Sequence, residues 1–218
     1  MARNYVFAPG EYYHLYARGV EKMPVYRDGA EYQRFLEGMY LFNAVQKGTE
    51  IREIKRSRGG LTSADSSSVF SFDRGRPLVD IGAYCLMPNH FHILVRENDS
   101  EGKGVSKFMQ RLMTSYTMYF NKKNERTGAL FGSSFKARHV TEDTHLKYLF
   151  AYIHLNPREI VDAHGLRDYE YSSYADYVGR KRIQQSIINP AAFPDYFSGG
   201  IGMERELDAW LKQPEWVE

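Results

Sequence analysis

Two apolar runs joined by Pro88-Asn89 are the feature that most restricts how this chain can fold. The runs cover residues 78–86 and 91–96, and their lengths are typical of β-strands. Proline followed by asparagine favours a tight turn between them. We therefore expect a hairpin, in which the first strand holds the register of the second.

The second strand of this hairpin carries two histidines, His90 and His92. Alternate residues of a strand point to the same face, so both imidazoles project together while Phe91 points into a core. Imidazole is the commonest metal ligand among side chains, so the pair predicts half of a cation site. The alternative is a strand that carries two structural histidines.

Helical and strand periodicities elsewhere complete the predicted fold. They predict strands over 12–18 and 135–140 and helices over 30–45, 105–121 and 141–156. The last helix has Thr141 as its expected N-cap and is ended by Pro157. Strand–helix–strand thus occurs twice. This predicts an α+β, ferredoxin-like split βαβ fold, with a four-stranded antiparallel sheet and helices on one face.

The composition limits the function less than the motifs do. The chain has 218 residues and a net charge of +2, so its composition does not itself indicate a nucleic-acid binder. Cys85 is the single cysteine, which excludes an intramolecular disulfide and fits a reducing cytoplasm. No long uncharged apolar stretch occurs, so we expect a soluble, cytoplasmic protein without a membrane partner.

The predicted last helix offers a third ligand for the histidine pair. Tyr152 and Asn156 lie four residues apart and therefore share one face of it. The amide oxygen of Asn156 would complete a site of two nitrogens and one oxygen, which suits Mg²⁺ or Mn²⁺ bound together with a phosphate. Asparagine is also common at helix ends, so a purely structural role is the alternative.

Several motifs taken together resemble the single-tyrosine HUH transposases, in particular the REP-associated tyrosine transposases. They lie at Tyr13-His14-Leu15-Tyr16-Ala17-Arg18-Gly19, Met87-Pro88-Asn89-His90-Phe91-His92, Leu130-Phe131-Gly132-Ser133-Ser134-Phe135-Lys136, Tyr152-Ile153-His154-Leu155-Asn156-Pro157 and Tyr171-Ser172-Ser173-Tyr174. The resemblance covers residues 10–178 in the family's order.

The resemblance implies metal-dependent nicking and strand transfer of single-stranded DNA. In this family the HUH histidines, here His90 and His92, bind a divalent cation, Mg²⁺ or Mn²⁺, together with Asn156. Tyr152 is then the nucleophile, and the product is a 5′-phosphotyrosine with a free 3′-hydroxyl. The expected partner is single-stranded or hairpin DNA, bound by a monomer or a homodimer.

On this basis we expect a catalytic domain over residues 1–160 and a mostly helical C-terminal extension over 161–218. Residues 48–76 are rich in glycine, serine and basic residues, which predicts a mobile insertion in the catalytic domain. Candidate phosphate contacts are the basic residues before the last helix: Lys122, Lys123, Arg126, Lys136 and Arg138.

Other interpretations of the same residues remain open. Tyr148 shares the face of Tyr152 but has no asparagine or glutamine four residues later. A protein that binds DNA or RNA hairpins on this fold without catalysis is the main alternative function. A histidine-based phosphohydrolase needs a further alternate histidine, and that position is Leu94.

Overall fold

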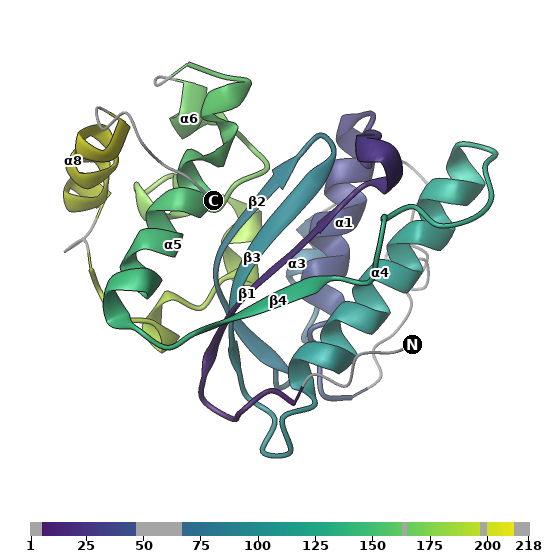
Figure 1. Cartoon of the computed structure of the whole chain (residues 1–218), viewed down its shortest axis with the longest axis horizontal. Coiled ribbons are helices and arrows are strands. Elements are labelled where there is room, and N and C mark those ends of the chain that lie inside the picture. The colour runs from purple at the N-terminus through teal and green to yellow at the C-terminus, as the bar shows by residue number, and fades with distance from the viewer. Residues whose placement is uncertain (1–5, 47–66, 163–164, 197–199, 212–218) are drawn as a thin grey trace.

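The computed structural model describes residues 6–46, 67–162, 165–196 and 200–211. Its centre is a four-stranded antiparallel sheet in the order β2-β3-β1-β4 (Figure 1). The strands are β1 (Tyr12–Arg18), β2 (Val79–Met87), β3 (His90–Glu97) and β4 (Lys136–Val140). This order, with a hairpin joining β2 to β3, confirms the predicted α+β, ferredoxin-like class.

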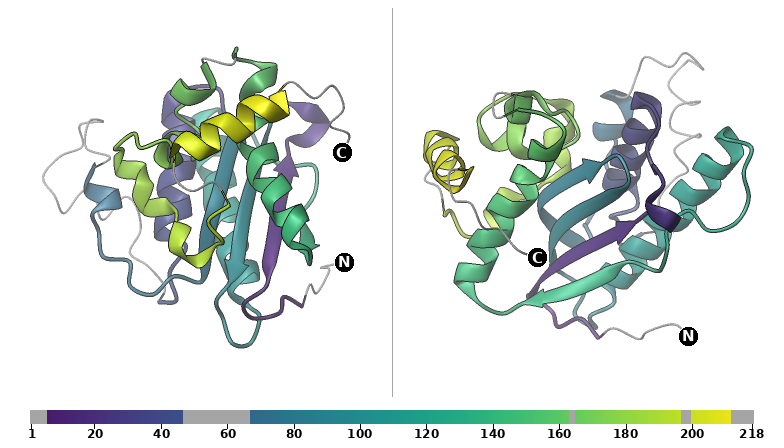
Figure 2. Two further views of the ribbon diagram at one scale, coloured as in Figure 1. Left: turned by 90° about the vertical axis from the view of Figure 1, so that its left-hand side faces the viewer. Right: turned by 45° about the horizontal axis from the view of Figure 1, so that its top comes forward.

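Helices cover both faces of the sheet. Helices α1 (Gly29–Leu41) and α4 (Gly104–Lys123) lie on one face, as predicted, and α5 (Asp143–Leu155) lies on the other (Figure 1). Neighbouring residues of β3 accordingly belong to different cores: Ile93 packs with α1 and α4, whereas Leu94 packs with α5. The two further views in Figure 2 show the same layers.

Carboxylates accept hydrogen bonds from backbone amides at the starts of two of the long helices. The Asp28 carboxylate accepts a hydrogen bond of 3.0 Å from the Glu31 amide at the start of α1. The buried Glu97 carboxylate does the same for the first turn of α4, accepting from the Val105 amide at 2.9 Å. The prediction of Thr141 as an N-cap is wrong, because α5 begins at Asp143 and Glu142 occupies the cap position.

Shorter elements connect and flank these layers. They are the 3-10 turns Val20–Lys22, Asn156–Glu159, Ile183–Ile187 and Pro190–Ala192, and the helices α3 (Ser67–Phe70), α6 (Gly165–Asp168), α7 (Tyr174–Tyr177) and α8 (Gly200–Leu211). Residues 48–66 of the predicted insertion lie outside the described residues. The remainder packs against α1, where the Tyr40 hydroxyl donates to the Phe72 carbonyl at 2.8 Å.

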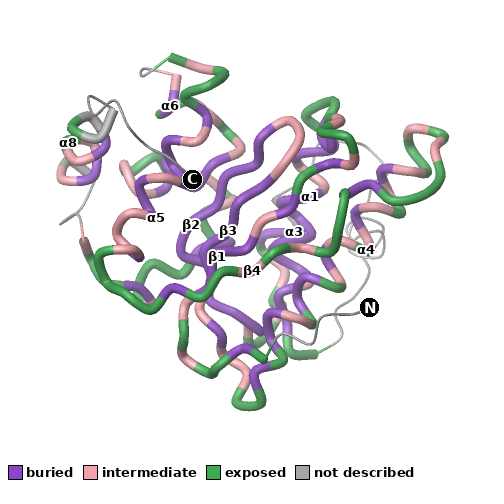
Figure 3. The backbone as a smooth tube through the Cα atoms, viewed as in Figure 1, coloured by how far each residue is buried: buried purple, intermediate pink, exposed green. Residues whose placement is uncertain are grey.

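The C-terminal extension covers the outer edge of β2. The Leu86 amide donates to the Tyr171 carbonyl at 2.9 Å, and the Ser173 amide donates to the Tyr84 carbonyl at 3.0 Å. With this cover on β2, and with β3 inside the sheet, both strands are buried along most of their length, whereas β4 is largely exposed (Figure 3). Within the extension, this edge-pairing segment separates the short helices α6 and α7.

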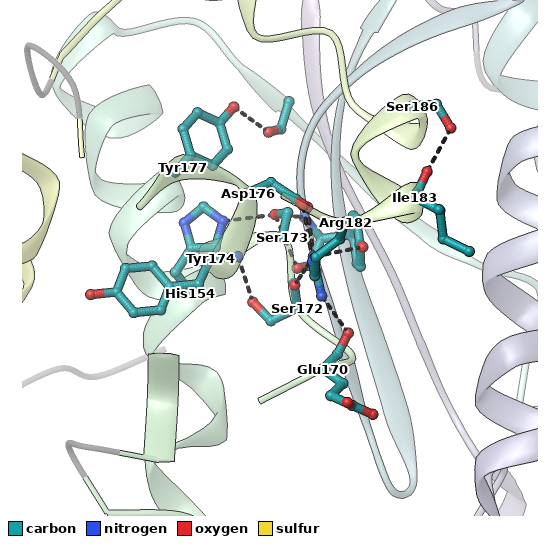
Figure 4. A network of polar contacts seen from close by, with 12 residues as sticks. His154, Glu170, Ser172, Ser173, Tyr174, Asp176, Tyr177, Arg182, Ile183 and Ser186 are labelled. Carbon is teal, nitrogen blue, oxygen red and sulfur yellow. Dashed lines mark hydrogen bonds and ion pairs between the residues drawn. The ribbon is translucent and has the colours of Figure 1, made fainter. Parts of the chain in front are cut away.

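Buried polar contacts hold the extension in place (Figure 4). Arg182 contacts both carboxylate oxygens of Asp176, at 2.9 Å and 2.6 Å, and donates to the Ser172 carbonyl at 2.8 Å.

Within the part of the chain that the structure describes, no helix is both long and apolar enough to cross a membrane.

Candidate active site

The two strand histidines face the α5 side of the sheet. His90 begins β3 and lies opposite Arg18 of β1, while His92 lies opposite Tyr16. His92 is buried and His90 is half-buried. Their ring centroids are 5.1 Å apart, and their planes are almost perpendicular. The hairpin therefore presents both imidazoles together, as the alternation of the strand predicts.

Asn89, in the hairpin turn, fixes the orientation of His90. Its side-chain nitrogen donates to the Lys22 carbonyl at 3.2 Å, so its oxygen faces the ring of His90. That oxygen lies 2.6 Å from His90 Nδ1. Because an amide oxygen only accepts hydrogen bonds, Nδ1 carries the proton and Nε2 of the neutral ring carries a lone pair.

His92 has a histidine partner of its own. Its Nδ1 lies 2.8 Å from Nε2 of His14 on the neighbouring strand β1. Burial, together with smaller contributions from the nearby His145 and Arg138, lowers the pKa of His14 to about 4. Burial also brings the pKa of His92 well below its usual value, with smaller contributions from the neighbouring histidines and Arg18. Both imidazoles are therefore neutral at neutral pH.

Helix α5 places Tyr152 and Asn156 against these histidines. The Tyr152 ring lies 5.4 Å from the ring of His92, edge to face, and is half-buried. Asn156 directly follows the last residue of α5, and its Oδ1 lies 3.2 Å from Nε2 of His90. The Asn156 side-chain nitrogen points back to the Tyr152 carbonyl at 3.5 Å, which supports this orientation of the amide.

The pair formed by His90 and Asn156 fits a divalent cation. Two acceptor atoms, a ring lone pair and an amide oxygen, face each other at 3.2 Å. Adjacent ligands of an octahedral ion with bonds of about 2.1 Å lie roughly 3 Å apart, so the spacing matches two positions of such a site. Among the described residues, no group of three or more His, Cys, Asp or Glu side chains could hold a metal. The position of its oxygen beside His90 fits Asn156 to the role of a third ligand to the histidine pair.

The five basic residues predicted as DNA contacts fall into two groups. Lys136 and Arg138 lie on β4 opposite Tyr16 and His14, so they share the face of the histidines. Lys136 Nζ lies 5.8 Å from the centre of the Tyr16 ring. The exposed Arg18 joins them across the sheet, beside His90.

The other three basic residues lie in the last turn of α4 or just after it, in the layer that covers the opposite face. Lys123 contacts the carboxylates of Asp28, at 2.5 Å, and Glu31, at 3.3 Å. Arg126 donates to the Asn121 side chain at 2.7 Å, and Lys122 is exposed. These interactions give Lys123 and Arg126 structural partners of their own.

Three residues of β1 belong to this site but were not singled out individually in the sequence analysis: His14, Tyr16 and Arg18. The sequence does contain a usable pattern, because polar or aromatic residues alternate with Leu15 and Ala17 on this strand. That pattern shows that the three share a face. It does not show that this face is the one carrying His90 and His92, which depends on pairing between β1 and β3.

The neighbouring tyrosines and histidines are placed differently from Tyr152. Tyr148 stacks on Tyr152 at 5.9 Å, whereas Tyr116 is buried in the opposite core. His154 points away from the site, and its Nε2 lies 2.7 Å from Ser173 Oγ (Figure 4). Among the tyrosines on α5, Tyr152 is the one with an amide ligand candidate one turn later.

Comparison with known proteins finds similarity to transposases. Residues 74–156 match a family model described as "Transposase IS200 like". This segment contains His90, His92, Tyr152 and Asn156, and its match agrees with the transposase resemblance drawn from the motifs. The chain is also similar to 14 solved chains. One, entitled "Structure of the REP associates tyrosine transposase bound to a REP hairpin", shows 14% identity and a TM-score of 0.49, covering 84% of this chain and 89% of that chain. No curated protein matches.

Proposed function

Because residues 74–156 form an IS200-like transposase segment, we propose that the protein cuts and rejoins single-stranded DNA through Tyr152. One observation carries this proposal. The Tyr152 ring stands 5.4 Å from His92, and Asn156, directly after the same helix, lies 3.2 Å from His90. A candidate nucleophile and candidate ligands for a cation thus come together from a strand and a helix, which supports the proposal.

The chemistry follows from the position of the tyrosine. Attack of the Tyr152 oxygen on a DNA phosphorus forms a new P–O bond and breaks the bond to the 3′ oxygen. The phenol gives up its proton, and the leaving 3′ oxygen takes one up. The result is a 5′-phosphotyrosine and a free 3′-hydroxyl. Because the covalent link conserves the phosphodiester energy, a 3′-hydroxyl can reverse the step and join strands without ATP.

The chain supplies both the ligands and the electrostatic setting for this step. A divalent cation such as Mg²⁺ or Mn²⁺, held by His90, His92 and Asn156, would polarise a non-bridging phosphate oxygen. Arg18, Lys136 and Arg138 project from the same face and would contact the phosphates on either side of the cut. These contacts suit a single strand or a hairpin end laid along β1 and β4.

Formation of a covalent adduct tests the proposal. Labelled single-stranded hairpin DNA would be mixed with the protein and Mn²⁺ or Mg²⁺, and then run on a denaturing protein gel. We expect a metal-dependent protein–DNA band that is absent from Tyr152→Phe and from His90→Ala. Tyr148→Phe is the matched control, since it removes a hydroxyl one helical turn away, and it should retain the band.

Two outcomes would contradict the proposal. An adduct that persists in Tyr152→Phe would show that another residue is the nucleophile. Tight hairpin binding without an adduct, across a varied pool of hairpins and both metals, would instead identify a DNA-binding protein that lacks the chemistry.

A further inference from the structure

His14 is a buried histidine that the proposed chemistry does not use directly. It is 7% exposed, and its ring lies nearly parallel to that of His92 at a centroid distance of 5.0 Å. The two rings share a hydrogen bond of 2.8 Å between His14 Nε2 and His92 Nδ1. A polar contact of this kind in a buried site restricts which protonation states the two rings can adopt.

A hydrogen bond between two imidazole nitrogens requires one proton and one lone pair. If His14 donated the proton, His92 Nδ1 would be the acceptor and the proton of neutral His92 would lie on Nε2. That nitrogen could then not bind a metal. If His92 Nδ1 donates instead, His92 Nε2 carries the lone pair, as a ligand requires.

His90 shows the same arrangement with a different partner. Asn89 accepts the Nδ1 proton of His90 at 2.6 Å, and Nε2 of His90 faces the oxygen of Asn156. Each of the two histidines therefore has a polar neighbour at Nδ1. Metal-ligating histidines characteristically use their second nitrogen in this way.

We propose that His14 is a positioning residue whose Nε2 accepts the Nδ1 proton of His92 and thereby leaves His92 Nε2 as the ligand atom. This inference rests on the proposed metal site, but it concerns a tautomer that exists before any metal or DNA is bound. A neutral imidazole suits this role in a buried position, because it accepts a hydrogen bond without burying a charge.

Two measurements on the metal-free and Mn²⁺-titrated protein test the role of His14. Long-range ¹H–¹⁵N correlation spectra report which nitrogen of His92 carries the proton. Calorimetric titration with Mn²⁺ reports affinity. We expect Nδ1–H in the wild type and an affinity about 10- to 100-fold weaker in His14→Phe, which keeps the ring but removes the acceptor.

Two further variants sharpen the test. His14→Gln offers an amide oxygen as acceptor and should restore both the tautomer and most of the Mn²⁺ affinity. His139→Phe is the matched control, because His139 lies on β4 opposite Tyr13 and faces the other side of the sheet. It should bind Mn²⁺ like the wild type.

The inference is overturned if wild-type His92 carries its proton on Nε2, or if folded His14→Phe binds Mn²⁺ as tightly as the wild type. If His14→Phe does not fold, the tautomer of wild-type His92 and the Mn²⁺ affinity of His14→Gln still test the inference. If His92 has the predicted tautomer but no DNA adduct forms, the role of His14 stands and the proposed strand transfer is refuted instead.

Discussion

Replacement of Arg182 by methionine should strongly destabilise the protein, because Arg182 neutralises a buried carboxylate. The Arg182 and Asp176 side chains are 10% and 0% exposed, and they meet at 2.6 Å (Figure 4). Arg182 also donates to the carbonyls of Glu170, at 2.7 Å, and Ser172, at 2.8 Å. Methionine retains much of the side-chain volume but none of these donors.

The expected loss in the free energy of unfolding follows from the buried charge of Asp176, which remains without a partner. Removing one partner of a buried ion pair costs about 3–5 kcal/mol, because the remaining charge stays desolvated. Burial already raises the pKa of Asp176 despite the Arg182 guanidinium, which acts to lower it. Without Arg182 this pKa rises further. When the pKa of a carboxyl is higher in the folded than in the unfolded state, the free energy of unfolding of the protein falls as pH rises. Arg182→Met should therefore lose more of this free energy at pH 8 than at pH 5.

Urea unfolding followed by circular dichroism measures these free energies. Arg180→Met is the matched control, because its partner Asp168 lies 2.9 Å away in an exposed pair of 49% and 76% exposure. Such a pair contributes about 1 kcal/mol or less. A double variant that also replaces Asp176 by asparagine should lose less than the sum of the single losses. The reasoning is refuted if Arg182→Met costs no more than Arg180→Met.

Three further predictions concern buried histidine, buried thiol and surface charge. Burial lowers the pKa of His154 to about 3, so this residue should contribute a loss of stability of about 1.4 kcal/mol per pH unit as pH falls from 6.5 to about 3. Urea titrations should show a slope that is smaller by this amount in His154→Gln, and equal slopes would contradict the assignment. Burial raises the pKa of Cys85, so a disulfide reagent should label this thiol in urea but not in the folded protein; rapid labelling without urea would show that it is accessible. Lys136→Ala and Arg138→Ala should each weaken hairpin binding and reduce the log–log salt slope by roughly 1, more than Lys122→Ala does, and equal effects in a binding titration would count against the β4 surface.

The sequence predicts the sheet well because its strands alternate clearly and its hairpin contains a strong turn. The strand predicted over 12–18 has those bounds in the structure, and those of the hairpin differ by about one residue. The C-terminal extension is harder to predict. Residues 171–173 pair with the edge of β2, and such a contact depends on tertiary position rather than on local periodicity.

Part of the candidate site can likewise be predicted from local sequence, and part of it depends on tertiary structure. The spacing of His90 to His92 and of Tyr152 to Asn156 is local, so sequence alone places each pair on one face. Their meeting depends on the packing of α5 against the sheet. The contribution of His14 depends on the register between β1 and β3, which no spacing within either strand reveals.

The charged strand β4 also governs how separate molecules meet. The extension covers the β2 edge, so among the described residues β4 is the edge that pairs on one side only. An uncovered edge invites a strand from another copy, and lysine or arginine on it discourages such pairing. The charges of Lys136 and Arg138 therefore disfavour edge-to-edge aggregation of the protein. Their replacement to study DNA contacts should also be checked for loss of solubility.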